Sequence, residues 1–218
     1  MTVTATETVV DLVTDALLDL EAGTLGQSPD ADQMAHGVRH LNRLMKRLQM
    51  LGFFQSLKTT TSLNALVINN YALSPARMFR IMNIQYKNTS GIEIPMIELT
   101  QEEYAEFPDK STSGIPTQFY YDRQRESARL YVWPMPASYT SETYEITYER
   151  EFEDIADEND TVDFPVEGYD ALVLGLAARL RHTYGKGQRK VDVAIEAKNA
   201  LDEFLASDTE GVVKFYSD

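Results

Sequence analysis

Apolar positions recur at helical spacing near both ends of the chain. The first such stretch covers about residues 6–21, where apolar side chains return every three or four positions. The second covers residues 28–52, with Ser28 expected as the N-cap and Pro29 as the first helical residue. Its apolar stripe steps by four and three and consists of Met34, Val38, Leu41, Met45 and Leu48. Residues 169–184 and 190–205 have the same spacing, so the pattern predicts four helices.

The middle of the chain has a different pattern. From residue 53 to residue 148 the apolar period shortens towards two, β-branched and aromatic residues become frequent, and turn residues divide the chain into short runs. Thr100, followed three residues later by Glu103, predicts a capped helical turn. The predicted strands, which we expect to form a small antiparallel sheet, are residues 80–86, 118–122, 130–133 and 144–150.

Together these elements predict an α+β fold. About four helices from both chain ends would form a helical core, with a central antiparallel β-rich insertion and a mostly extended C-terminal tail. The predicted segments are the N-terminal helices at 1–52, the β-rich insertion with its hairpin and acidic loop at 53–165, the C-terminal helices at 166–206, and the tail at 207–218.

Composition narrows the classes of function. The chain has 218 residues, 43% of them hydrophobic, with no cysteine and three histidines. Disulfides, thiolate catalysis and cysteine-ligated zinc are therefore excluded. No long apolar run or secretion signal is present, so we expect a soluble protein of a cytoplasm-like compartment, with no membrane partner. The net charge of −14 argues against wrapping around nucleic acid, which depends on lysine and arginine.

Candidate catalytic and metal-binding groups are few. The glycines match no phosphate-binding loop, so no cofactor is expected. His36 and His40 have the i, i+4 spacing of metal ligands, but without the flanking carboxylate pattern we interpret them as solvated or interface residues. Paired carboxylates at 102–103, 157–158 and 202–203 have the residue types of a glycosidase. Because the chain contains 34 acidic residues, we interpret these pairs as exposed charge.

The most distinctive stretch is GIPTQFYYDRQRESARLYVWPMPASY, residues 114–139, which contains the single tryptophan. Its aromatic residues have three possible roles: stacking on bases or sugars, packing of a half-buried sheet, or contact with another chain. The acidic charge disfavours nucleic acid and favours packing combined with an interface. The arginines at the hairpin turn would meet the acidic run 151–163 of a neighbouring copy. The residues predicted for this subunit or tail interface are Tyr120, Tyr121, Arg123, Arg125 and Trp133.

The order of several motifs resembles one family. The stretches SPDADQMAHGVRHLNRLMKRLQMLGFF, YALSPARMFRIM, GIPT followed by YYDR, WPMP, and LVLGLAARL occur in this order in the head-to-tail adaptors of short-tailed bacteriophages, also called tail accessory or portal adaptor proteins. The resemblance covers roughly residues 5–206. Leu48 departs from it, because members often have a tryptophan late in this helix.

This resemblance implies a non-enzymatic structural role. It implies a ring, usually of twelve copies, bound under the portal at one capsid vertex of the virion after synthesis in the host cytoplasm. The implied partners are the portal ring, further copies of the chain, and downstream tail proteins such as nozzle and tail fibre. DNA would pass through the lumen without specific binding. The residues predicted to dock the tail on the portal are Val212, Val213, Phe215 and Tyr216.

Two other classes of function remain open at this stage. One is a virion-associated peptidoglycan hydrolase that uses paired carboxylates, which an assay on purified wall material would reveal. The other is a head-completion plug that binds DNA directly, which predicts strongly salt-dependent DNA binding.

Overall fold

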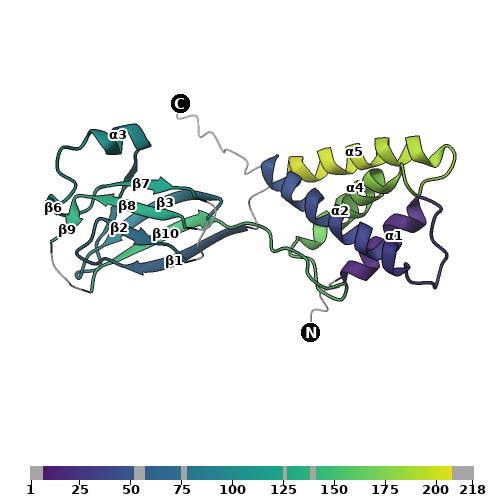
Figure 1. The fold of residues 1–218 in the computed structure, drawn as a ribbon, viewed down its shortest axis with the longest axis horizontal. Helices are drawn as coiled ribbons and strands as arrows, with labels where there is room; N and C mark the ends of the chain where they lie inside the picture. Colours follow the sequence, from purple (N-terminus) through teal and green to yellow (C-terminus); the bar gives the residue numbers. More distant parts are fainter. Residues whose placement is uncertain (1–6, 52–56, 75–77, 125–126, 138–140, 208–218) are drawn as a thin grey trace, which may run out of the picture. The chain divides into compact units, whose positions relative to one another are not determined.

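In the computed structural model, the chain folds into two structural units (Figure 1). The β unit is Leu57–Glu151, and the helical unit combines the two chain ends, Met1–Ser56 and Phe152–Asp218. The structure describes residues 7–51, 57–74, 78–124, 127–137 and 141–207. The predicted α+β class is confirmed, whereas the C-terminal tail lies outside the described residues.

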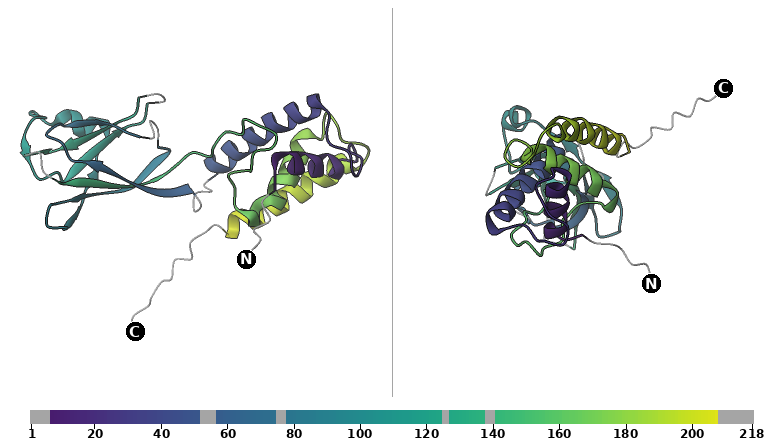
Figure 2. Two further views of the ribbon diagram at one scale, coloured as in Figure 1. Left: turned by 90° about the horizontal axis from the view of Figure 1, so that it is seen from below. Right: turned by 90° about the vertical axis from the view of Figure 1, so that its right-hand side faces the viewer.

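The helical unit contains four α-helices and one short 3-10 helix among its described residues. Their bounds are α1 Val9–Asp19, α2 Ala31–Met50, η2 Val166–Gly168, α4 Tyr169–Leu180 and α5 Arg189–Ser207. Helix α4 packs against each of the other three α-helices, which the views in Figure 2 also show. This central position agrees with its sequence, LVLGLAA, which is apolar around most of the helix.

The start of α2 differs from the prediction. The helix is capped by Asp30, which accepts the Gln33 N–H at 2.8 Å, while the Gln33 side chain accepts the Asp30 N–H at 3.1 Å. A reciprocal capping box needs a polar side chain three residues after the cap. Ser28 would have Ala31 at that position, so the helix begins later than Ser28 and Pro29 predict.

The acidic run after the β unit is anchored to the helical unit and is not simply a solvated loop. Phe152 and Ile155 are buried. The Asn42 side chain exchanges two hydrogen bonds with the Ile155 backbone, at 3.0 and 3.1 Å, and Lys46 donates to the Phe152 carbonyl at 2.7 Å. The predicted insertion ended at residue 165, whereas the structure assigns residues from Phe152 onward to the helical unit, because apolar residues between the acids pack there.

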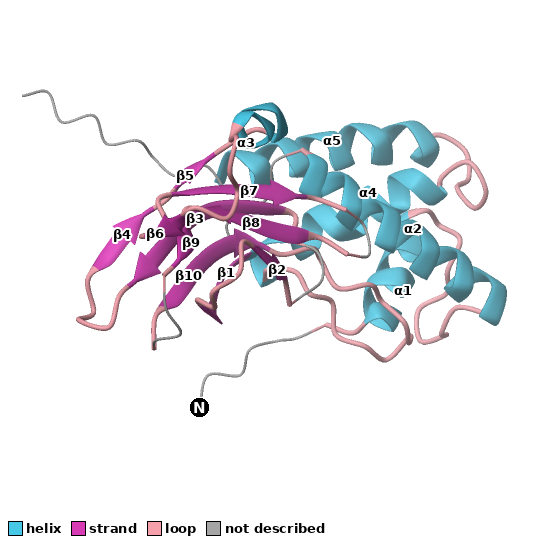
Figure 3. Ribbon diagram, turned by 60° about the vertical axis from the view of Figure 1, so that its left-hand side comes forward, coloured by secondary structure: helices cyan, strands magenta, loops and turns pink. Residues whose placement is uncertain are grey.

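The β unit has two four-stranded sheets where the sequence predicted one small sheet (Figure 3). The first sheet is antiparallel and has the order β1-β10-β3-β4. The second has the order β2-β8-β7-β5, and its β5–β7 pair is parallel. A parallel β6–β9 pair and the short helix α3 complete the unit. The bounds are β1 Lys58–Asn64, β2 Asn70–Ala72, β3 Arg80–Lys87, β4 Glu93–Pro95, β5 Ile97–Glu98, α3 Gln101–Glu106, β6 Ser113–Gly114, β7 Gln118–Asp122, β8 Arg129–Trp133, β9 Met135–Pro136 and β10 Thr143–Glu149.

The two larger sheets share one hydrophobic core. Ile84, Tyr144 and Ile146 of the first sheet and Phe119 and Leu130 of the second belong to the same buried cluster. Alternate residues of each strand face this cluster, as the period of two in the sequence predicts. The sandwich therefore leaves the opposite face of the β7–β8 hairpin for other contacts.

Candidate interaction surfaces

The outward face of the β7–β8 hairpin carries three aromatic side chains. Tyr120 pairs with Tyr131 across the strands, and Trp133 lies two residues further along β8. The rings of Tyr120 and Tyr131 stack with centroids 5.7 Å apart and an interplanar angle of 19°. Because residues alternate between faces, Phe119 and Tyr121 point into the core instead. The hairpin therefore has an apolar inner face and an aromatic outer face.

Helix α3 covers this aromatic outer face. Tyr104 is only 7% exposed, and its ring centroid lies 5.8 Å from that of Tyr120 and 5.4 Å from that of Tyr131. Phe107, directly after the helix, stacks on Trp133 at 4.2 Å and 8°. Offset and near-parallel stacking at such distances contributes beyond the burial of area. We call these five residues, Tyr104, Phe107, Tyr120, Tyr131 and Trp133, the aromatic cluster.

The loop after α3 fastens the cluster in place. The Trp133 indole N–H donates to the Asp109 carbonyl at 3.2 Å. Lys110 Nζ donates to the carbonyl oxygens of Ala105 at 3.3 Å and Phe107 at 3.1 Å, and lies 5.4 Å from the centre of the Tyr104 ring. A lysine at this position satisfies carbonyl groups that the end of a helix leaves without partners. The aromatic cluster is thus held largely by contacts within its own chain.

The start of α3 is fixed in the same way as the starts of α1 and α2. Thr100 and Glu103 form the predicted capping box, in which Glu103 accepts the Thr100 N–H at 2.7 Å. The hydrogen bonds from the Thr100 backbone and side chain lower the pKa of Glu103. Just before the cap, the Leu99 N–H donates to the Phe119 carbonyl at 2.7 Å, which ties the helix to the hairpin.

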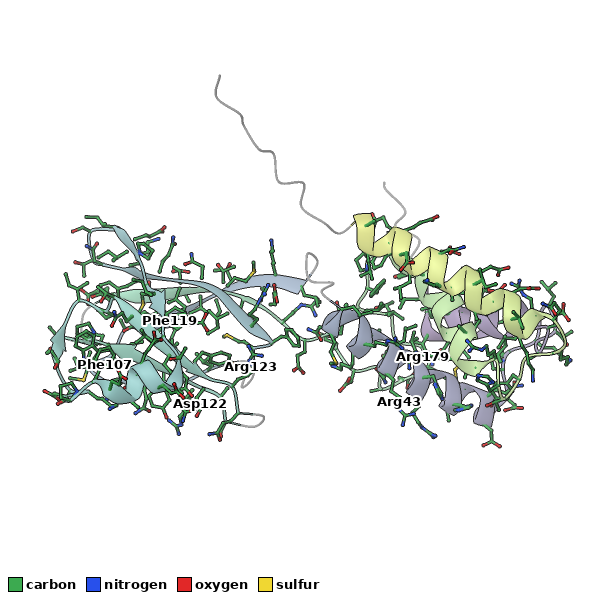
Figure 4. All side chains as sticks on the ribbon, turned by 90° about the horizontal axis from the view of Figure 1, so that it is seen from above. Arg43, Phe107, Phe119, Asp122, Arg123 and Arg179 are labelled. Carbon is green, nitrogen blue, oxygen red and sulfur yellow. The ribbon has the colours of Figure 1, made fainter. Side chains whose placement is uncertain are left out.

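The predicted interface residues therefore have different environments. Tyr121 is 8% exposed, and its hydroxyl group bonds to the backbone of Met78, so its inclusion in the predicted interface is corrected. Tyr120 and Trp133 are half-buried under α3 and its loop, while Arg123 is exposed at the end of the hairpin away from Phe107, as Figure 4 shows. Arg125 lies outside the described residues.

Sequence reasoning missed the partners that cover the hairpin. The predicted helical turn that begins at Thr100 gave no role to Tyr104 or Phe107. Their three-residue spacing would place them on one face of a helix, and this face was the available signal for a packing surface. Which surface it meets depends on the sheet order, which the spacing does not give. The four predicted portal-docking residues, Val212, Val213, Phe215 and Tyr216, lie outside the described residues.

Two of the six paired carboxylates, Glu103 and Asp157, accept local hydrogen bonds. The pKa of Asp157 is lowered by hydrogen bonds from Asn159, and the pKa of Glu103 is also lowered. A general acid of a glycosidase needs the opposite shift. The residues that the structure describes contain no group of three or more histidine, cysteine or carboxylate side chains that could hold a metal ion.

The two helical histidines contact each other and a tyrosine. The rings of His36 and His40 meet edge to face with centroids 4.5 Å apart, and His36 Nδ1 lies 3.2 Å from the Tyr184 hydroxyl oxygen. Burial lowers the pKa of His40, and His36 and nearby arginines lower it further. These histidines belong to a positively charged region of α2.

None of the helices in the described part of the chain combines the length and apolar character needed to cross a membrane.

Comparison with known families defines the class of protein. A family model matches residues 7–213, which include nearly all of both units. The class is that of phage head-to-tail adaptors, so the chain is a structural component at the head–tail junction of the virion. The matching family is described as SU10 adaptor protein, and the chain belongs to that family. The prediction from motif order is thereby confirmed.

A solved structure is similar at a lower level. It is a chain from a structure of the neck of an empty gene transfer agent particle, which was computed with C6 symmetry. That chain is 16% identical in sequence to this one. The similarity covers 85% of this chain and 84% of that chain, with a TM-score of 0.32. No curated protein matches the sequence.

Proposed function

We propose that this chain forms a ring of twelve copies bound under the portal. The ring extends the DNA channel, retains the packaged genome and presents a platform for downstream tail proteins such as nozzle and tail fibre. The observation that carries this proposal is membership of the SU10 adaptor protein family over residues 7–213. We further propose that the chain has no catalytic role.

The division into two units supports the proposal. A ring subunit must contact neighbours on both sides and other proteins above and below, and two separately folded units offer more distinct surfaces than one. The β unit suits a platform because its aromatic cluster fixes α3 and its loop to the hairpin. Rigid surfaces lose little conformational entropy when a partner binds.

The net negative charge of the chain supports a role in lining a channel through which DNA slides. Nucleic-acid binding depends on phosphate neutralisation by lysine and arginine, and this chain has 20 such residues against 34 acidic ones. Many copies around a lumen would repel phosphates on average. Retention of the genome would then rest on closure of the channel and not on adhesion.

The C-terminal residues Val212, Val213, Phe215 and Tyr216 remain our proposed portal-docking segment. Four apolar or aromatic residues that follow Gly211 and the polar stretch SDTE can order on an apolar groove of the portal, with an entropic cost offset by their burial. We expect deletion of 211–218 to weaken recruitment to purified portal rings in a sedimentation assay. The circular dichroism and thermal midpoint of the deleted chain should stay unchanged.

A matched control makes this deletion specific. A full-length chain with serine at the four apolar positions keeps the length and charge of the tail but removes its apolar surface. Equal loss of recruitment in both variants supports docking by these side chains. Recruitment that equals that of the intact chain in either variant contradicts it.

A further inference from the structure

Charge is strongly segregated along this acidic chain. Residues 33–92 contain eight lysines and arginines and no aspartate or glutamate, although the whole chain has a net charge of −14. Four of the eight lie on α2, whose sequence from Gln33 to Met50 has no acidic residue. The helical unit therefore carries a local positive region whose role is not explained by the fold.

This positive region is a continuous surface. His36, His40, Arg43 and Arg47 step by four, three and four residues, so they lie along one side of α2. Arg179 of α4 joins them, and Figure 4 shows Arg43 and Arg179 on the neighbouring helices. We call these five residues the basic face.

The packing of α4 on α2 explains why Arg179 reaches this face. The two helices run antiparallel, because His36 meets Tyr184 and Leu44 meets Gly175, where an added Cβ would lie 2.9 Å from Leu44 Cδ2. Arg179 lies one turn beyond Gly175 on α4. Long helical side chains point towards the N-terminus of their own helix, which directs this guanidinium towards Arg43 and Arg47.

The arginines of the basic face have no carboxylate partner within the described chain. No ion pair joins Arg43, Arg47 or Arg179 to a described acidic residue, whereas the nearby Lys46 pairs with Asp154 at 3.2 Å. Burial lowers the pKa of Arg179, and the charges of Arg47 and Arg43 lower it further. Like charges are thus held together on a partly buried surface, which favours an anionic partner.

The same unit also has an acidic surface. Asp11 and Asp15 lie four residues apart on α1, and Glu7 lies just before the N-cap residue Thr8. The first turn of α1 is joined to the acidic run, because the Val10 N–H donates to the Glu158 carbonyl at 3.1 Å. We call the surface formed by Glu7, Asp11, Asp15, Asp157 and Glu158 the acidic face.

Each of the two faces carries one sign of charge. At 1.5 Å per helical residue, the basic stripe of α2 extends about 16 Å, and Asp11 and Asp15 of the acidic face span about 6 Å of α1. Burial raises the pKa of Glu7, and Asp15 and Asp11 raise it further. No ion pair joins a carboxylate of the acidic face to a described basic residue, so the two faces do not neutralise each other within one chain.

We propose that the basic face of one copy binds the acidic face of the next copy. This inference rests on the proposed ring, since a head-to-tail contact between two different surfaces can repeat until the ring closes. It assigns the ring contact to the helical units, with Arg43, Arg47 and Arg179 paired with Asp15 and the 157–158 carboxylates. A second copy is favoured over DNA because the acidic face lies on the same unit and would repel phosphates.

Charge reversal on each face provides the test. One variant carries Arg43→Glu and Arg47→Glu, and the other carries Asp15→Lys and Glu158→Lys, which leaves the capping residue Asp11 intact. Each variant alone should need a roughly 100-fold higher concentration than wild type to fill portal rings, because like charges then meet at every contact. An equimolar mixture should recover assembly, since reversed faces of the two variants are complementary in an alternating ring.

The controls separate folding, charge and binding. Lys186→Glu with Lys198→Glu changes the net charge of the helical unit by the same amount at exposed positions, and it should assemble like wild type. Recovery in the mixture shows that the single variants are folded. If wild type itself fails to assemble on portal rings, the proposed function is contradicted. If wild type assembles and the Arg43, Arg47 variant assembles equally well, only the present inference is overturned.

Two other results would also overturn the inference. Single variants that fail and are not recovered by mixing would indicate that the basic face meets the portal or another tail protein. Wild type that binds duplex DNA through Arg43 and Arg47, with assembly unchanged in the variant, would identify the face as a phosphate-binding surface.

Discussion

The hydroxyl group of Tyr121 should contribute strongly to the stability of the β unit. It donates to the Met78 carbonyl at 2.8 Å and accepts the Met78 N–H at 2.9 Å, and both residues are buried. A single side-chain atom thus satisfies both backbone groups of one buried residue. Replacement of Tyr121 by phenylalanine keeps the ring in the core and removes both of these bonds.

The size of the effect follows from the two backbone groups left without a partner. A buried donor or acceptor that loses its hydrogen bond costs about 1–3 kcal/mol, and some relaxation of the chain recovers part of that. We therefore expect Tyr121→Phe to lower the free energy of unfolding of the β unit by about 2–4 kcal/mol. With a urea dependence of about 1.5 kcal/mol per M, the unfolding midpoint should fall by about 1.3–2.7 M.

The single tryptophan gives a selective assay. Trp133 lies in the β unit and stacks on Phe107, so its fluorescence reports the unfolding of that unit, while far-ultraviolet circular dichroism is dominated by the helices. Tyr120→Phe is the matched control, because the Tyr120 hydroxyl has no hydrogen bond to a described residue. It should change the stability by less than about 0.5 kcal/mol. A Tyr121→Phe midpoint equal to that of the control would refute the assignment of Tyr121 to the core.

Two further predictions concern the helix contacts and the α3 cap. A Cβ at Gly37 would lie 2.7 Å from Val13 Cγ1, so Gly37→Leu should destabilise the helical unit by about 2–3 kcal/mol. The control Ala35→Leu, at an exposed position of the same helix, should change the stability little. Thermal unfolding followed by the helical circular dichroism signal measures both variants. The pKa of Glu103 in the folded protein is lowered from its ordinary value of 4.5. The ionised Glu103 side chain therefore stabilises the folded state above pH 4.5, and this stabilisation is lost as the pH falls through the lower pKa of the folded protein. The urea midpoint from Trp133 fluorescence should fall less steeply on acidification in Glu103→Gln, and equal slopes in both proteins would contradict the role of the cap.

Local patterns predicted the helices and the hairpin because their signals are contained within one element. The stripe on α2 and the alternation along β7 and β8 both follow from fixed periods, and the structure has these elements. The Thr100 box was predicted because cap and partner are three residues apart. The late start of α2 shows the limit of prediction from local patterns. Ser28 and Asp30 are both good N-cap residues, and only the partner side chain at position 33 decides between them.

Contacts between distant segments were not predictable in this way. The parallel pairing of β5 with β7 depends on sheet order, and the cover of the hairpin by Tyr104 and Phe107 depends on that pairing. Strand β1 also gave a weak signal, because KTTTSLN alternates among polar residues. The acidic run was predicted only as a loop, because its seven carboxylates conceal the spacing of Phe152, Ile155 and Val162, which are buried.

The basic face was concealed for a similar reason. A net charge of −14 suggests an acidic surface everywhere, but charge averaged over a chain does not give its distribution. The absence of acidic residues from 33 to 92 was visible in the sequence. Its meaning depended on Arg179, which is more than 130 positions away from Arg47 in the chain and joins α2 only through the packing of α4.

The most direct test of the adaptor role is the mass of the complex between this protein and its portal ring in solution. Purified full-length protein should be measured alone and then mixed with portal rings encoded by the same phage. We expect each portal ring to take up a fixed number of copies, twelve, and excess protein to stay unbound. A protein that does not bind the portal at micromolar concentration, or that binds in a variable number of copies, would contradict it.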